Sequence, residues 1–300
     1  VWASTFHSAC VRILRRDIDR IGFDRSFTIY DTDDSKRVIK DILKELSLDE
    51  KAFPTRELLS IISRAKDEMQ SPEEFIQQWQ AINDWRRIRI GKVYALYNKK
   101  LCDANALDFD DIILHTVRLL QSCPDVRSYY QNKFRYILID EYQDTNEVQD
   151  CIFQAISKEG RNLFTVGDVK QSIYRFRLAD PTIFLGKYRQ FADAAKAAEG
   201  QPRRMVLSRN FRSRREVLDA ANTVFADIMS REMGEMDYTA EERLYFGADY
   251  YAEAAGRETE MHVISVEDTP EQRFDRTETE ARFAARRIRQ LLDEGFPVQG

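Results

Sequence analysis

The chain has 300 residues, enough for about two compact domains, and 43% of them are hydrophobic. A net charge of −5 gives no overall sign of nucleic-acid binding. No apolar run approaches membrane-spanning length, and residues 1–5 lack the basic and apolar segments of a signal peptide. A cytoplasmic globular protein is therefore expected. The four cysteines lie far apart and form no zinc or redox motif, which favours reduced thiols.

The first half of the chain reads as mainly helical. Residues 1–5 predict a short strand, which leads into a helix that begins near Ser8. Apolar residues then recur at helical spacing, with Ser, Thr or Asp near each start, over 33–46, 55–69, 71–80 and 85–102. No convincing strand lies between residues 33 and 120, so this block is interpreted as an all-helical subdomain.

The pattern changes after Phe134. Two continuous apolar runs, 135–139 and 162–166, predict strands buried on both faces, and the helix expected at 148–156 makes them a parallel pair. Further strands are expected at 204–208 and 261–266, followed by helices at 214–229 and 277–292.

Two adjacent carboxylates, Asp140 and Glu141, end the first of these strands in the sequence DEYQDTN. Ligands bind at this edge of a parallel sheet. One carboxylate there could hold Mg²⁺ and the other could activate water, as phosphoanhydride hydrolysis requires. Most Asp-Glu pairs are merely surface charges, but the position at the end of an apolar strand favours chemistry.

The next strand leads into VGDVKQSIYRFR, residues 166–177. Gln171 opens a helix beside the carboxylates and could sense a γ-phosphate. Tyr174 and Phe176 alternate with arginines, including Arg177, which suits base stacking and phosphate contact. On composition alone, these aromatic residues would more often belong to a core.

Two segments are basic and lack carboxylates: 85–101, with six Lys and Arg, and 203–215, with six Arg. Such runs can contact phosphate, although most are simply solvated helix faces.

Five motifs in order resemble the motor core of the UvrD/Rep/PcrA-like superfamily 1A DNA helicases. They are TFHS at 5–8, LDFDD at 107–111, DEYQDTN at 140–146, VGDVKQSIYRFR at 166–177 and SRNFRS at 208–213. The first hundred residues look most like the PcrA/UvrD branch. Residues 166–250 look more like the helicase subunit AddA of helicase-nucleases, which would add a nuclease-complex partner subunit.

This resemblance implies an α/β fold: a RecA-like P-loop NTPase motor domain with a parallel sheet, an inserted all-helical subdomain and the start of a second RecA-like domain. The implied boundaries are 1–15 with 106–200 for domain 1A, 16–105 for the helical 1B subdomain and 201–300 for a truncated domain 2A. The implied activity is an ATP-dependent DNA helicase in repair or recombination, with 3′ to 5′ polarity. Its substrates would be single-stranded DNA and single-strand/duplex junctions.

The resemblance also implies a role for each motif residue, with ATP and Mg²⁺ as cofactors. Asp140 would bind Mg²⁺, Glu141 would activate the attacking water, and Gln171 would sense the γ-phosphate. Arg212 would be an arginine finger from the second motor domain. The remaining residues would contact DNA: Thr5, Phe6, His7, Ser8, Tyr174, Phe176 and Arg177.

The chain also departs from the family pattern. Phe176 stands where Trp is common, Phe211 where Tyr is common, and Leu178 where Gly is common. No phosphate-binding loop, GxxxxGK followed by Ser or Thr, occurs in these residues. In the family that loop precedes TFHS, so the chain is interpreted as a piece of a longer helicase, with negligible ATPase activity by itself. The alternatives are a DNA-binding motor relic without enzymatic activity and a metal-dependent nuclease.

Overall fold

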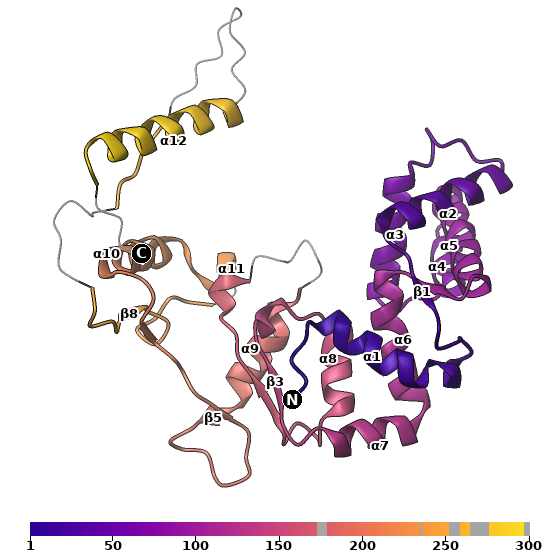
Figure 1. The fold of residues 1–300 in the computed structure, drawn as a ribbon, viewed down its shortest axis with the longest axis horizontal. Helices are drawn as coiled ribbons and strands as arrows, with labels where there is room; N and C mark the ends of the chain where they lie inside the picture. Colours follow the sequence, from indigo (N-terminus) through magenta and orange to yellow (C-terminus); the bar gives the residue numbers. More distant parts are fainter. Residues whose placement is uncertain (173–178, 235, 252–258, 265–275, 297–300) are drawn as a thin grey trace, which may run out of the picture. The chain divides into compact units, whose positions relative to one another are not determined.

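The computed structural model describes residues 1–172, 179–234, 236–251, 259–264 and 276–296. The chain divides into two compact units, Val1–Met205 and Val206–Gly300, and each is described here by itself. Helices and short parallel strands make up both units (Figure 1). Within the described ranges, no helix combines the length and apolar character needed to cross a bilayer.

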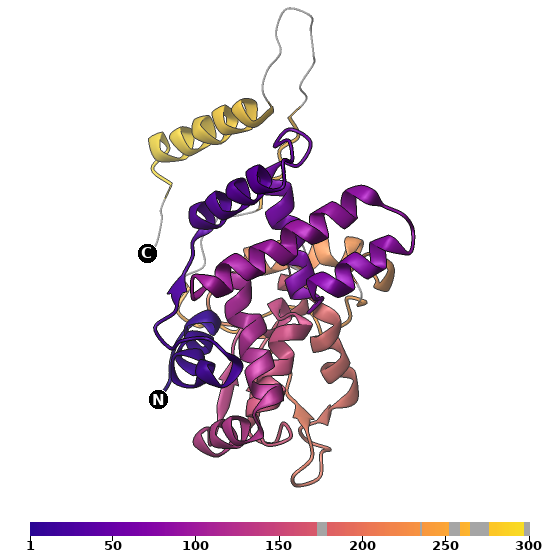
Figure 2. The same cartoon turned by 90° about the vertical axis from the view of Figure 1, so that its right-hand side faces the viewer.

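One core of the first unit is built from four helices: α1 (Phe6–Asp17), α6 (Phe109–Ser122), α7 (Pro124–Lys133) and α8 (Glu147–Ile156). Helix α6 packs against α1, α7 and α8 (Figure 1, Figure 2). Capping boxes begin α6, with Asp108 and Asp111, and α8, with Asn146 and Gln149. These polar caps satisfy the free N–H groups of the first turn, which fixes where each helix begins.

A second core of this unit lies among α2 (Thr32–Glu45), α3 (Thr55–Asp67), α4 (Pro72–Gln80) and α5 (Trp85–Asp103). The four helices predicted from the apolar spacing are confirmed. Helices α4 and α5 approach closely at Gly91, where a Cβ atom would collide with the side chain of Ile76.

The expectation of no strand between residues 33 and 120 is wrong. Strand β2 (Ala106–Leu107) pairs in parallel with β1 (Thr28–Ile29). Each strand has only two residues, too few for an alternating pattern to stand out beside the long helices.

Strands β3 (Ile137–Ile139) and β4 (Leu163–Thr165) form the predicted parallel pair, with α8 between them in sequence. The expected burial of both faces is wrong. Leu138 is 74% exposed and Phe164 49% exposed, whereas Ile137, on the opposite face, packs against the first core. Among the described residues this sheet has two strands, and the helical core covers one face only.

Residues 1–5 form no strand, contrary to expectation. A strand needs a neighbour for its backbone hydrogen bonds, and no described residue pairs with this segment. Instead, the ring of Trp2 lies 5.3 Å from that of Phe134.

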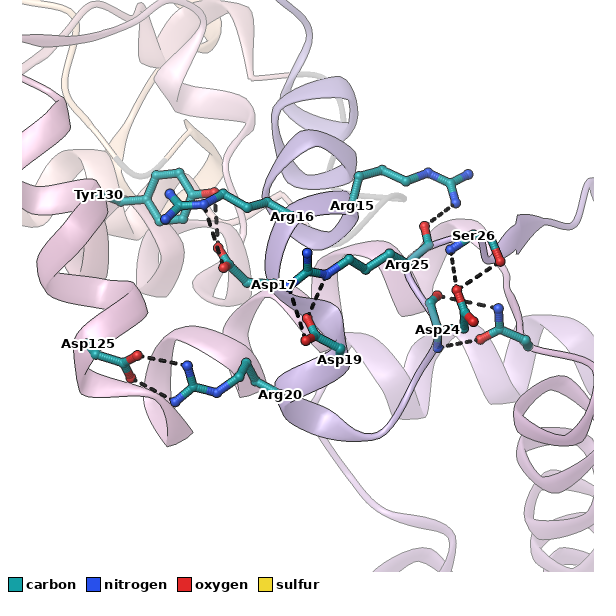
Figure 3. Close-up of polar contacts among 11 residues, drawn as sticks. Arg15, Arg16, Asp17, Asp19, Arg20, Asp24, Arg25, Ser26, Asp125 and Tyr130 are labelled. Atoms are coloured by element: carbon teal, nitrogen blue, oxygen red, sulfur yellow. Dashed lines mark hydrogen bonds and ion pairs between the residues drawn. The ribbon is translucent and has the colours of Figure 1, made fainter.

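Ion pairs and hydrogen bonds of arginine side chains hold the turn that follows α1 (Figure 3). Arg20, in the 3₁₀ helix η1 (Ile18–Ile21), makes two hydrogen bonds to Asp125 of α7, at 2.8 and 3.2 Å. Arg25 pairs with Asp19 at 2.9 Å, and Arg15 donates to the carbonyl of Arg25 at 2.7 Å. These arginines are therefore engaged within the protein.

A buried ion network joins α3 to the start of α6. Lys66 is 1% exposed, and its Nζ lies 2.6 Å from Asp108 and 2.8 Å from Asp111. The Tyr97 hydroxyl also donates to Asp108, at 3.0 Å. Burial alone would lower the pKa of Lys66, but the two carboxylates raise it above its usual range. The LDFDD motif is thus both a helix cap and the acidic side of this network.

The first unit ends with α9 (Pro181–Gln190) and the parallel strands β5 (Ala192–Asp193) and β6 (Arg203–Arg204). The second contains the parallel strands β7 (Arg209–Asn210) and β8 (Tyr245–Phe246), with helices α10 (Arg215–Ile228), α11 (Arg231–Gly234) and α12 (Arg276–Asp293). The helices predicted at 214–229 and 277–292 are confirmed.

The strand expected at 204–208 is wrong. Strand β6 ends at Arg204 and β7 begins at Arg209, leaving an exposed connection that includes Leu207. Residues 261–264 form no strand either, although Met261 and Val263 are apolar and exposed. The rest of that expected strand, 265–266, lies outside the described residues. Without a partner, an apolar run cannot form a ladder, whatever its β propensity.

Candidate functional site

Asp140 and Glu141 stand at the carboxyl end of β3, and both are exposed. The Asp140 carboxylate accepts the N–H of Glu141 at 3.0 Å, and Glu141 adopts left-handed backbone angles, φ 52° and ψ 39°. Behind them, burial and the charge of Glu141 raise the pKa of Asp144. The predicted position of both carboxylates at the strand end is confirmed, and the structure shows that they face solvent.

Gln171 follows β4 in a short 3₁₀ helix, η3 (Val169–Gln171), which is capped by Asp168. Its side-chain amide donates to Asp168 at 3.0 Å, and Lys170 pairs with the same carboxylate at 2.8 Å. The helix expected to begin at Gln171 would run into residues 173–178, which lie outside the described residues; in the described part, Gln171 ends a 3₁₀ turn. Gln171 is exposed beside the loop end of β4.

Gln143 connects the two strand ends, a role that the sequence did not assign to it. It is 4% exposed, and its Oε1 accepts the backbone N–H of Asp168 at 3.0 Å. Gly167 passes so close that a Cβ there would lie 2.8 Å from this Oε1. The sequence signal for this contact is an amide residue two positions after the Asp140–Glu141 pair.

The TFHS segment forms the N-cap and first turn of α1. Thr5 is the N-cap, and its hydroxyl donates to that of Ser8 at 2.9 Å. Both residues are exposed and free to meet a ligand. Phe6 is half-buried, and its ring lies 5.2 Å from that of Phe153 on α8.

Phe153 also links this segment to the carboxylate turn, because its ring lies 6.2 Å from that of Tyr142. His7 is half-buried near Phe109, with 5.9 Å between their rings. Burial lowers the pKa of His7, and the charge of Asp110 opposes this shift. The structure therefore brings the first and third motifs together through aromatic side chains.

Tyr174, Phe176 and Arg177 lie at 173–178, outside the described residues. Their stacking roles remain predictions from the sequence.

Arg212 is exposed in the second unit, just after β7. The carboxamide oxygen of Asn210 accepts the N–H groups of Arg212, at 2.9 Å, and of Ser213, at 2.8 Å. The Tyr251 hydroxyl donates to the Arg212 carbonyl. Backbone bonds fix this turn, so the guanidinium is presented to solvent.

The basic segment of α5 is partly neutralised. Arg86 makes two 2.9 Å hydrogen bonds to Glu57, and Lys100 pairs with Glu45 at 2.9 Å. Lys92 and Lys99 are exposed. In the second basic segment, Arg204, Arg214 and Arg215 lie over aromatic rings. Several cations of both segments are therefore already engaged in contacts within the protein.

The carboxylates fit a magnesium ion bound with a nucleotide. Mg²⁺ usually takes one or two protein carboxylates and fills its other positions with water and phosphate oxygens. Asp140 offers one exposed carboxylate of this kind, and within the described part of the chain no three His, Cys, Asp or Glu side chains form a closed metal cage.

The profile of the UvrD/REP helicase N-terminal domain matches residues 1–192. The chain belongs to this family. A UvrD/REP domain agrees with the mixed α/β structure and is consistent with a RecA-like motor.

Several proteins similar to this UvrD/REP chain are ATP-dependent DNA helicases named PcrA. That of Bacillus subtilis (strain 168) is 45% identical over 232 residues, which cover 77% of this chain and 30% of that protein. That of Staphylococcus epidermidis (strain ATCC 35984) is 43% identical over 224 residues, covering 75% and 29%. That of Staphylococcus aureus (strain Mu50) is 41% identical over 232 residues, covering 77% and 30%. The chain thus spans about 30% of the length of these relatives.

Proposed function

We propose that the full-length protein is an ATP-dependent DNA helicase that couples ATP hydrolysis to movement on single-stranded DNA and to duplex unwinding. The observation that carries this proposal is the pair of exposed carboxylates, Asp140 and Glu141, at the carboxyl end of parallel strand β3. Gln143 ties this turn to the loop that holds Gln171. Membership in the UvrD/REP family and the PcrA relatives support the same reading.

In this proposal Asp140 holds the Mg²⁺ of bound ATP, and the metal supplies charge stabilisation for the phosphates. Glu141 accepts a proton from the attacking water. Gln171 contacts the γ-phosphate, and Arg212 reaches it from the second unit as an arginine finger.

The DNA-contacting residues are proposed from the motifs. Thr5 and Ser8 offer exposed hydroxyl groups, with Phe6 and His7 behind them. Tyr174 and Phe176 stack on bases, and Arg177 supports the same region. The substrates are single-stranded DNA and single-strand/duplex junctions, with 3′ to 5′ movement in repair or recombination in the cytoplasm. A nuclease-complex partner subunit, suggested by the AddA resemblance, is a further prediction.

The proposed domain organisation assigns 1–15 and 106–200 to the first RecA-like domain, 16–105 to an inserted helical subdomain and 201–300 to the start of a second RecA-like domain. The 300 residues contain no phosphate-binding loop, so by themselves they are expected to show negligible ATPase activity. Turnover by the chain alone within tenfold of an intact relative would contradict this expectation.

Glu141→Gln in the full-length protein tests the central assignment. Hydrolysis should be abolished while affinity for single-stranded DNA stays nearly unchanged, because the carboxylate acts on water rather than on DNA. Glu147→Gln, at an exposed glutamate in the first turn of α8, is the matched control and should leave both intact. Equal loss of hydrolysis and binding in Glu141→Gln would refute the role.

A DNA-binding motor relic is the second candidate, since the described residues of the chain include exposed cations and aromatic rings. It predicts strand binding without ATP turnover by the wild-type full-length protein. A nuclease would instead cleave DNA with Mg²⁺ in the absence of ATP.

A further inference from the structure

The backbone at Glu141 needs support from its surroundings. Its left-handed angles, φ 52° and ψ 39°, are unfavourable for any residue with a Cβ atom. Such conformations persist where neighbouring structure over-determines them. The next residue, Tyr142, supplies that structure through both its backbone and its side chain.

Tyr142 is wholly buried, at 0% exposed, and anchors the turn through its backbone. Its N–H donates to the Val166 carbonyl beyond β4, at 2.9 Å, and its carbonyl accepts the Thr145 N–H at 3.2 Å. Glu141 is thus fixed on one side by β3 and on the other by Tyr142.

The Tyr142 hydroxyl lies between two charged side chains from different helices. It donates to the Asp150 carboxylate of α8 and accepts from the Lys187 ammonium of α9. Lys187 and Asp150 also pair directly, at 3.1 Å, and their side chains are only 20% and 22% exposed. Burial and the bond to Asp150 raise the pKa of Tyr142, so the hydroxyl stays protonated at neutral pH.

This arrangement is distinct from the candidate catalytic groups. Lys187 and Asp150 belong to helices that carry none of the five motifs, and both contact the hydroxyl of Tyr142, the residue after Glu141. The same ring lies beside Phe153 and Phe184, with 6.2 Å between centroids in each case. Its position in the core is therefore already set by packing, and the hydroxyl contacts add orientation.

We propose that Lys187 and Asp150 are positioning residues, which clamp the Tyr142 hydroxyl and thereby hold the Glu141 carboxylate at the strand end. This inference rests on the proposed ATPase function. Neither residue contacts nucleotide. Their effect is on how often Glu141 is in the orientation needed to activate water.

The test uses the full-length protein with Lys187→Met, which keeps an unbranched side chain one atom shorter and removes its charge. A small misplacement of a catalytic group lowers kcat by roughly 10-fold to 100-fold, with little change expected in the KM for ATP. Tyr142→Phe should behave alike, because it keeps the ring and removes the clamped hydroxyl. Lys187→Arg should restore much of the activity. Lys158→Met, at an exposed lysine just after α8, is the control.

A second readout needs no nucleotide. Hydrogen exchange of the amides at residues 142–145 should quicken in Lys187→Met and Tyr142→Phe, while amides in α2 keep their wild-type rates. Unchanged kcat together with unchanged local exchange would overturn the proposal. So would a uniform rise in exchange with a higher KM, because the network would then stabilise the fold in general. If the wild-type protein lacks ATPase activity, the proposed function fails, and the exchange result still decides whether the clamp exists.

Discussion

The side chain of Gln143 holds the backbone of Asp168: its Oε1 accepts the Asp168 N–H at 3.0 Å. One residue thus joins the turn after β3 to the turn after β4. The two candidate catalytic segments are separated in sequence by α8, yet they share this partly buried contact.

Gln143→Leu should lower the free energy of unfolding by about 1–3 kcal/mol, because the Asp168 N–H would lose its buried partner. Urea denaturation of the chain measures this change. Gln121→Leu, at an exposed site on α6, should stay within about 0.5 kcal/mol of wild type. Similar effects of the two substitutions would mean that the Gln143 contact adds nothing to stability.

Two glycines near the site should respond in opposite ways to alanine. At Gly167 the new Cβ would lie 2.8 Å from Gln143 Oε1 and 3.1 Å from the Gln143 backbone N, so Gly167→Ala should force the two turns apart and lower the melting temperature. At Gly186, within α9, no described atom outside the neighbouring residues and the helix's own backbone lies within 4 Å of the new Cβ. Gly186→Ala should stabilise the helix by about 0.5–1 kcal/mol. A thermal unfolding series checks the order, and a Gly167→Ala variant as stable as wild type would contradict it.

Lys66→Met should be strongly destabilising. It leaves the buried carboxylates of Asp108 and Asp111 without their cation, which costs about 3–5 kcal/mol when a buried pair is broken. The control is Lys36→Met, which removes an exposed pair with Asp33 and should cost less than about 1 kcal/mol. Equilibrium unfolding in urea compares them, and equal losses would refute the importance of burial.

His115 should make the chain sensitive to acid. Burial, with a smaller effect of Arg118, lowers the pKa of His115 from 6.5 to about 3. Its Nδ1 has no hydrogen-bond partner within the described ranges. Between pH 6.5 and pH 3, His115 binds a proton in the unfolded chain but not in the folded chain. The free energy of unfolding therefore falls as the pH falls from 6.5 toward 3.

His115→Leu should therefore reduce the dependence of the unfolding free energy on pH under acid conditions, by up to about 1.4 kcal/mol per pH unit. Unfolding free energies at pH 7 and pH 4.5 give the slope. Asp67, whose pKa is raised to about 7 by burial and nearby carboxylates, contributes a slope of opposite sign. That slope is common to wild type and variant and cancels in the comparison.

Long periodic elements were predictable from the sequence. The helices α2 to α5 and the parallel pair β3 and β4 follow from apolar spacing, because each element repeats its signal over several residues. The position of Asp140 and Glu141 at the end of a strand followed from the apolar run before them.

Features that depend on distant partners were not predictable. Nothing local in residues 1–5 or 205–208 shows that they find no strand to pair with among the described residues. The exposure of Leu138 likewise depends on which elements cover the sheet. Contacts such as Gln143 with Asp168, or Lys187 with Tyr142, join residues far apart in sequence through single side chains, which leave no periodic signal.

At position 141, the left-handed backbone lowers the stability of the fold, while the glutamate side chain is the candidate catalytic base. Glycine would adopt these angles without the steric cost, about 1–2 kcal/mol, that a Cβ atom incurs there. A redesign that optimised folding energy alone would therefore discard Glu141 and produce a sturdier chain without its candidate base. Any engineering of this scaffold has to hold that position fixed and seek its gains elsewhere, for example at Gly186.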